Sequence, residues 1–211
     1  MSSSPRWRRR KEARPQELLE AALEVFAEKG FNAARVEDIA ERAGVSKGTV
    51  YLYFETKEEV FRSLVRENLL ARITPIRELM LHHDGATGDL IALVLSTIAN
   101  IIVHSKLAAV PKIIIAESGN FPQLAEFYRR EVIDVGLGIL RAIVERGIAK
   151  GEFRKLDPDH IARLCIAPLL LSLVWKVSFD QFDETPFDIE AFVKTHLDVL
   201  LKGLSVAGGA P

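Results

Sequence analysis

The residues best suited to bind another molecule in this sequence lie close together, between positions 46 and 57. Four of them carry hydrogen-bond donors at short spacing: Lys47, Thr49, Tyr51 and Tyr53. Gly48, among them, has no side chain to obstruct a close approach of the backbone. On a helix these donors form one edge, while Val50 and Phe54 fall on the side facing a core. Such an edge suits the phosphates and base edges of a nucleic-acid duplex.

Two short helices must position this edge. We expect helices over residues 36–43 and 47–54, joined by a tight turn at Gly44, with the Ser46 hydroxyl capping the second helix. An earlier helix should begin at Pro15 and stop at Gly30, with its apolar residues on one face. Two short helices with a glycine-containing turn have the layout of a helix-turn-helix, whose second helix enters the major groove.

The run VEDIAERAGVSKGTVYLYFETKEEVF, residues 36–61, resembles the DNA-binding signature of the TetR family of transcriptional repressors. The preceding LLEAALEVFAEKGF, residues 18–31, is similar to that family's first helix. The specific resemblance therefore covers about the first third of the chain. It implies a ligand-responsive repressor that binds operator DNA as a homodimer and is released by a small-molecule effector.

The resemblance also implies individual contacts. Phosphate contacts would come from Tyr51, Tyr53 and Lys57, and base or groove contacts from Ser46, Lys47, Gly48 and Thr49. The chain departs from the family at Arg35, which stands where a threonine often contacts phosphate: arginine can reach a phosphate but cannot cap a helix as a hydroxyl does. Leu52 replaces a frequent aromatic and is suited to a thymine methyl group. Solubility alone for Lys47 and Lys57, and core packing for Tyr51, are the competing interpretations.

The first fourteen residues are strongly basic. Six cations stand against the single acid Glu12: Arg6, Arg8, Arg9, Arg10, Lys11 and Arg14. As a flexible arm, residues 1–14 could place Arg9, Arg10 and Lys11 in a neighbouring minor groove. A solvated tail without function explains the same composition equally well.

The remaining chain reads as all-α, because apolar residues recur at helical spacing and no stretch alternates as a half-buried strand would. A fourth helix should open with a capping box of Thr56 and Glu59 and be kinked or broken at Pro75, before a loop at residues 82–88. Further helices, about nine in all, are expected over residues 89–103, 109–118, 122–150, 158–179 and 188–203. We expect a DNA-binding domain at 15–60, a larger C-terminal ligand-binding and dimerisation domain at 61–205, and a disordered tail at 206–211.

The last two expected helices carry more apolar residues than one core can cover, which favours pairing with a second copy of the chain. Helical phase proposes six interface residues: Leu169, Leu173, Phe192, Val193, Leu197 and Leu200. A fully intramolecular core is the alternative. With two-fold symmetry, the recognition helices would lie about 34–36 Å apart on a near-palindromic operator.

The resemblance places an effector cavity in the C-terminal domain. Polar residues set among apolar ones, and two aromatics, are the candidates to line it: Asn100, His104, Glu117, Asn120, Tyr128, Trp175 and Phe179. Ordinary structural use is the competing interpretation for each of them, since these positions rest on helical phase and not on a motif.

Composition and motifs exclude other classes of protein. The single cysteine, Cys165, allows no disulfide framework and fits the cytoplasm. The longest apolar run, residues 164–175, is interrupted by Pro168 and Ser172, so we expect no membrane span, and the basic N-terminus lacks the apolar core of a signal peptide. No metal site, cofactor motif or catalytic constellation stands out, so we expect no enzyme. A helical adaptor that binds only proteins would leave the donors at 47–53 unexplained.

Overall fold

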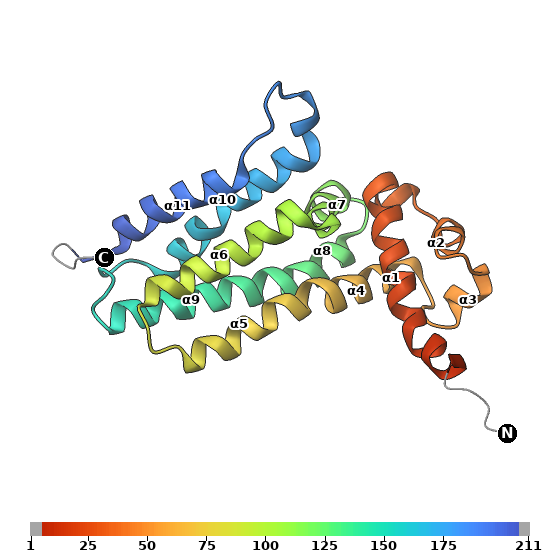
Figure 1. Cartoon of the computed structure of the whole chain (residues 1–211), viewed down its shortest axis with the longest axis horizontal. Coiled ribbons are helices and arrows are strands. Elements are labelled where there is room, and N and C mark those ends of the chain that lie inside the picture. The colour runs from red at the N-terminus through yellow and green to blue at the C-terminus, as the bar shows by residue number, and fades with distance from the viewer. Residues whose placement is uncertain (1–5, 207–211) are drawn as a thin grey trace. The chain divides into compact units, whose positions relative to one another are not determined.

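The computed structural model describes residues 6–206, with side chains from Pro15 onward except that of Thr74. Over this range the chain forms nine continuous helical segments and no strand, and its one bridge joins Phe153 to Ser205. Figure 1 labels the helices. The predicted all-α class is confirmed. The first five residues of the expected arm, and the tail from residue 207, lie outside the described residues.

The chain divides into two compact units. Unit 1 contains the residues up to Leu70 together with Ala109–Phe127, and unit 2 contains Ala71–Ala108 and the residues from Tyr128 onward. The expected domain boundary at residue 60 therefore moves to Leu70. The segment Ala109–Phe127, expected in the C-terminal domain, packs with the N-terminal one.

Unit 1 is built on a long first helix, α1 (Arg6–Ala33). It begins at Arg6 and not at Pro15, so the expected arm from Arg6 to Arg14 continues the helix. The prediction of its end is confirmed, because the backbone leaves the helical region at Gly30, where φ is +74°. Such a φ favours glycine, which has no Cβ to clash.

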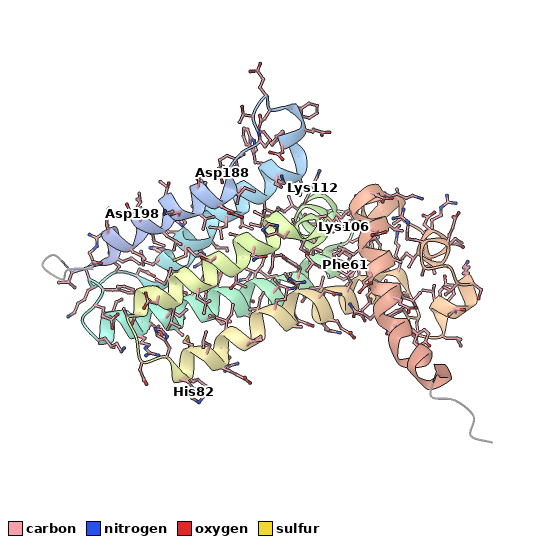
Figure 2. All side chains as sticks on the ribbon, viewed as in Figure 1. Phe61, His82, Lys106, Lys112, Asp188 and Asp198 are labelled. Carbon is pink, nitrogen blue, oxygen red and sulfur yellow. The ribbon has the colours of Figure 1, made fainter. Side chains whose placement is uncertain are left out.

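Six further helical elements belong to unit 1. They are α2 (Val36–Arg42), α3 (Lys47–Tyr51), α4 (Lys57–Leu64), the π-helical turn η1 (Val65–Leu70), α7 (Ala109–Glu117) and α8 (Pro122–Tyr128), whose last residue belongs to unit 2. Phe61 of α4 is fully buried where α4 meets α1 (Figure 2), with ring centroids 5.6 Å from Phe26 and 5.5 Å from Phe31. These rings form the centre of the unit 1 core.

The helix that opens at Thr56 does not break at Pro75. The Thr56 hydroxyl accepts from the Glu59 backbone N–H at 3.1 Å, as predicted, but the Glu59 carboxylate accepts from Glu55 N, so only half of the capping box forms. The helix continues through η1 into α5 (Ala71–His82), which contains Pro75. A π-helical turn directly before a proline helix is one way to accommodate the missing backbone donor.

Unit 2 is a bundle in which α6 (Thr87–His104), α9 (Asp134–Ala149) and α10 (Pro158–Ser178) all pack on one another. The final helix, α11 (Ile189–Leu204), packs on α6 and α10, and α5 packs on α9. The shared core is apolar and includes Leu95, Ile143, Cys165 and Leu169. Three short helical turns complete the unit: η2 (Lys106–Ala108), η3 (Arg129–Ile133) and η4 (Asp180–Phe182).

Two of the bundle helices, α6 and α10, have the length and apolar composition of a membrane span, a property shared by the core helices of soluble proteins. The expected interruption at Pro168 is wrong, because α10 runs through it without a break. The Ser172 hydroxyl donates to the Pro168 carbonyl at 2.9 Å. The two residues thus belong to one regular helix.

Candidate DNA interface

The turn between α2 and α3 fixes the direction of the second helix. Gly44 has a φ of +67°, and backbone bonds from Gly44 N to Glu41 O (3.0 Å) and from Val45 N to Ala40 O (2.9 Å) close the end of α2. Ser46 then caps α3: its Oγ accepts from Thr49 N at 3.2 Å and lies 2.9 Å from Thr49 Oγ1. The predicted glycine turn and serine cap are both confirmed.

The two sides of α3 have opposite characters. Val50 is fully buried and Phe54, just after the helix, is almost so. The other side is open to solvent: Ser46, Lys47 and Gly48 are exposed, and Thr49 and Tyr53 are half-buried. Tyr51 is 45% exposed and Leu52 is 81% exposed. The donors therefore form an accessible edge, as their spacing predicts.

The ammonium group of Lys47 is held at this edge by two neighbours. Its Nζ lies 2.5 Å from the Glu37 carboxylate on α2 and 5.6 Å from the centre of the Tyr51 ring. The hydrogen bond with Glu37 raises the pKa of Lys47, and the same bond lowers the pKa of Glu37. Both groups are therefore charged near neutral pH.

Arg35 is the residue before α2, and its side chain makes no capping bond, as expected of an arginine. The start of α2 is capped from the other direction, because Arg35 N donates to Asp38 Oδ2 at 2.9 Å. Asp38 also pairs with Lys29 at 2.8 Å, and this hydrogen bond holds the pKa of Asp38 below its usual range. The guanidinium of Arg35 is exposed and does not cap the helix.

Lys57 differs from the other predicted contacts. Its Nζ donates to three backbone carbonyls at the end of α1 and just beyond it: Phe31 O at 2.6 Å, Asn32 O at 3.2 Å and Ala34 O at 2.8 Å. It also lies 4.5 Å from the centre of the Phe31 ring, and burial lowers its pKa. All three ammonium protons are thus directed at the chain itself, so the group fixes the approach to α2.

The end of α1 is held by a second set of contacts, which the sequence did not predict. Asn32 N donates to Glu117 Oε1 of α7 at 3.1 Å, and the Phe121 ring lies 4.9 Å from that of Phe31, edge to face. Asn120 Nδ2 steadies the same carboxylate at 3.2 Å. No local motif signals a contact between residues 85 positions apart.

Family models match both parts of the chain. The model described as bacterial regulatory proteins, tetR family, matches residues 18–64, and that described as tetracyclin repressor-like, C-terminal domain, matches residues 82–184. The HTH-type transcriptional repressor KstR2 of Rhodococcus jostii is 31% identical over 199 residues, which are 92% of this chain and 93% of that protein. The chain belongs to the TetR family.

Two further matches extend over nearly the whole chain. The fatty acid metabolism regulator protein of Bacillus subtilis is 28% identical over 198 residues, 92% of this chain and 98% of that protein. The crystal structure of FadR from Bacillus subtilis in complex with stearoyl-CoA has a TM-score of 0.74 at 27% identity, and the match covers 90% of this chain and 98% of that one. The predicted function, a ligand-responsive DNA-binding transcriptional repressor, is confirmed at the level of the family.

In this TetR-family chain, three of the six residues expected at the dimer interface are buried inside the protomer. Leu169 is 0% exposed, Leu173 5% and Val193 4%, so they pack inside the protomer. Phe192, Leu197 and Leu200 are half-buried; the last two pack on the same core. The apolar residues left exposed lie about one residue away in helical phase, at Leu164, Leu170 and Leu171 of α10 and Val199 of α11. The number of apolar residues on α10 and α11 predicts that some of them are exposed, but it does not predict which ones.

The residues expected around an effector are divided between the two units. Glu117 and Asn120 belong to unit 1, whereas the other five belong to unit 2. Asn100 and His104 are exposed on α6, and His104 Nε2 lies 3.6 Å from the carboxylate of Glu190 on the surface. Tyr128 alone is buried, which raises the pKa of its hydroxyl.

The two aromatics expected to form a cavity wall also lie at the surface. Trp175 is 37% exposed and Phe179 47% exposed, with ring centroids 5.4 Å apart. Trp175 Nε1 donates to Asp183 Oδ2 at 2.5 Å. They therefore anchor the turn that follows α10. Single polar residues among apolar ones are too common to reveal a site by phase alone.

Proposed function

We propose that this protein represses transcription by binding a near-palindromic operator as a homodimer, with α3 of each subunit in the major groove. The observation that carries the proposal is the two-sided character of α3: Val50 is buried while the donor edge is accessible. Base and groove contacts would come from Ser46, Lys47, Gly48 and Thr49. Phosphate contacts would come from Arg35, Tyr51 and Tyr53. Lys57 would act indirectly, by holding the backbone before α2.

We assign the dimer contact to the exposed apolar residues of α10 and α11. Leu164, Leu171 and Trp175 follow one another at helical spacing along α10, and Val199 is 65% exposed on the adjacent α11. A two-fold axis beside these helices would bring the same stripe of each copy together. Exposed leucines at this spacing have no other described cover.

For the effector we propose an acyl-CoA thioester. The support is the relative crystallised with stearoyl-CoA, which matches this chain over nearly its full length. An apolar helical unit such as unit 2 suits the acyl chain of such a ligand. The site of action would be the cytoplasm, where acyl-CoA and operator DNA meet.

The segment Ala109–Phe127 gives the effector a route to the DNA-binding unit. The chain leaves unit 2 after Ala108 and returns to it at Tyr128, and the segment between carries Glu117 and Phe121 to the end of α1. A π-helical turn begins one residue after the return, and another ends at Leu70, where the chain first crosses. Strain from a filled unit 2 would reach Asn32 through this covalent path. A coupling of about 1–3 kcal/mol is enough to change operator occupancy.

Selection of duplexes from a random library by the wild-type protein would test the proposal. We expect an enriched inverted repeat, bound by the dimer, and release of that duplex by micromolar stearoyl-CoA. CoA and stearate, each alone, are the matched controls and should release much less. Enrichment without an inverted repeat would reject the symmetric dimer, whereas a complex unchanged by stearoyl-CoA would reject only the effector.

A further inference from the structure

An acidic residue stands directly beside the proposed DNA-reading edge. Glu37, the second residue of α2, is ion-paired with Lys47, the first residue of α3. The side chains of both are about half exposed, Lys47 at 51% and Glu37 at 54%. A carboxylate is repelled by phosphate, so its presence here works against DNA affinity in general.

The pair is not needed to hold the two helices together. Ion pairs as exposed as this one contribute little to stability, because water already solvates both charges. The Gly44 turn, the Ser46 cap and the buried Val50 fix α3 without it. The ion pair between Glu37 and Lys47 is therefore not what holds α3 in place.

The pair does restrict where the Lys47 ammonium can go. Lysine has a flexible stem and binds phosphates readily as a point charge. Held 2.5 Å from Glu37 and over the Tyr51 ring, its Nζ lies at the junction of α2 and α3, not at the end of a freely rotating chain. On a random duplex only the phosphates recur at fixed positions, and reaching them would separate the pair. A matching sequence also offers acceptors on base edges in the groove.

Two other cations of unit 1 are paired in the same way. Arg42, the last residue of α2, lies 2.9 Å from Glu24 and 2.6 Å from Glu28 of α1, and Lys29 lies 2.8 Å from Asp38. Non-specific affinity for DNA comes from cations that displace counterions from phosphates. Pairing these two cations with acids lowers their share of that non-specific affinity.

We propose that Glu37 is a positioning residue for specificity: it holds Lys47 for contact with base edges and withholds it from the phosphates of arbitrary DNA. This inference rests on the proposed contact between α3 and DNA. It assigns to α2 a part in discrimination that the donor edge of α3 alone does not supply.

The test is Glu37→Gln, which keeps the shape and removes the charge. We expect a threefold to tenfold tighter binding of a random duplex, on the order expected for one released cation, and a steeper dependence of log K on log salt by about one unit. Binding of the selected operator should change less, so the ratio of the two affinities should fall at least threefold. Equal changes on both duplexes, or an unchanged salt slope, would overturn the proposal.

The matched control is Glu41→Gln, on the same helix. Glu41 is exposed and, within the described part of the chain, forms no ion pair. The charge change is identical, so a general electrostatic effect would appear in both variants. An equal gain from Glu41→Gln would therefore count against a role specific to Glu37. Thermal melting should be the same for both variants.

A double-mutant cycle with Lys47→Ala separates positioning from simple repulsion. If Glu37 acts through Lys47, then Glu37→Gln should leave the salt slope unchanged in the Lys47→Ala background. A gain that persists there would show plain repulsion of phosphate and overturn the proposal. Lys47→Ala alone tests the proposed function: if it leaves operator binding intact, the assignment of the α3 contact has failed and not merely the role of Glu37.

Discussion

The α2–α3 hairpin buries its apolar residues, whereas the α10–α11 face, formed by Leu164, Leu171, Trp175 and Val199, leaves them exposed. In the hairpin, Val50 and Phe54 point into the core and the outer edge is polar. On α10, Leu164 is 56% exposed and Leu171 60% exposed, although the helix is apolar on nearly every side. The first surface is suited to a charged, hydrated partner such as DNA. The second is suited to a surface like itself.

This contrast implies that the two surfaces can be damaged separately. A change in the hairpin should alter affinity and sequence preference while the protein stays dimeric. A change on α10 should dissociate the dimer. Each monomer then binds only one half of the operator, so operator binding should fall although the hairpin is intact.

The largest effect is expected from Leu171→Glu. Two charges would be buried at a symmetric interface, so the dimer dissociation constant should rise at least about 30-fold, the loss typical of an interface hot spot. Sedimentation velocity would show monomers, and operator binding would become concentration-dependent. Leu81→Glu is the control, because Leu81 is 73% exposed on α5 of the same unit. Dimers that persist in Leu171→Glu would place the interface elsewhere.

The difference between the two surfaces also explains what the sequence could and could not predict. The turn at Gly44, the cap at Ser46 and the burial of Val50 were all predicted correctly, since each depends on residues within a few positions. Leu169 was expected at the dimer interface although it is buried, because α10 has apolar residues at nearly every phase. Periodicity can identify the core side only where one side is polar.

Long-range contacts set a second limit. Glu117 was expected to line an effector cavity in the C-terminal domain. Its carboxylate instead accepts from Asn32 N, and both residues lie in unit 1. Lys57 was expected to meet phosphate, yet backbone carbonyls take all its protons. In both cases the charged group was expected to bind another molecule, but it binds backbone groups from a distant part of the chain. Sequence spacing carries no signal for such partners.

Lys57→Met should have the next largest effect, on stability. Three carbonyls would lose a charged donor, so we expect a loss of about 1–3 kcal/mol in the free energy of unfolding and a lower melting temperature. Lys29→Met, which removes an exposed cation from the same unit, should change stability far less. If Lys57 instead bound phosphate directly, its loss would lower the salt slope by about one unit and leave the melting temperature alone.

The pH dependence of stability gives an independent reading of Lys57. Burial lowers its pKa below the ordinary value of 10.5 in the folded chain, so between the two values the unfolded chain binds more protons. The contribution of this residue to stability should therefore rise as pH increases through that window. Chemical denaturation of wild type and Lys57→Met over a pH series that ends at 10.5 would measure it, and parallel pH curves for the two proteins would contradict the lowered pKa of Lys57.

Tyr51→Phe should weaken DNA binding by about 1–2 kcal/mol per subunit, the contribution of one hydroxyl bound to a charged oxygen. Because phosphates are common to all sequences, operator and random duplexes should lose affinity by similar factors. Fluorescence anisotropy with both duplexes would show this. The dimer should be unaffected, so a loss that follows the protein concentration would indicate damage to the α10–α11 face instead.

Thr49→Val should have the smallest effect on affinity and the sharpest effect on preference. The substitution keeps the shape of the side chain and removes a hydroxyl that lies 2.9 Å from Ser46 Oγ, while the backbone N–H that Ser46 caps remains. We expect about 1 kcal/mol less discrimination at one base pair of each half-site and little change elsewhere. Selection of duplexes by the variant would reveal the relaxed position. A uniform loss at every position would mean that Thr49 supports the helix and reads no base, which would leave Lys47 as the main reader of the edge.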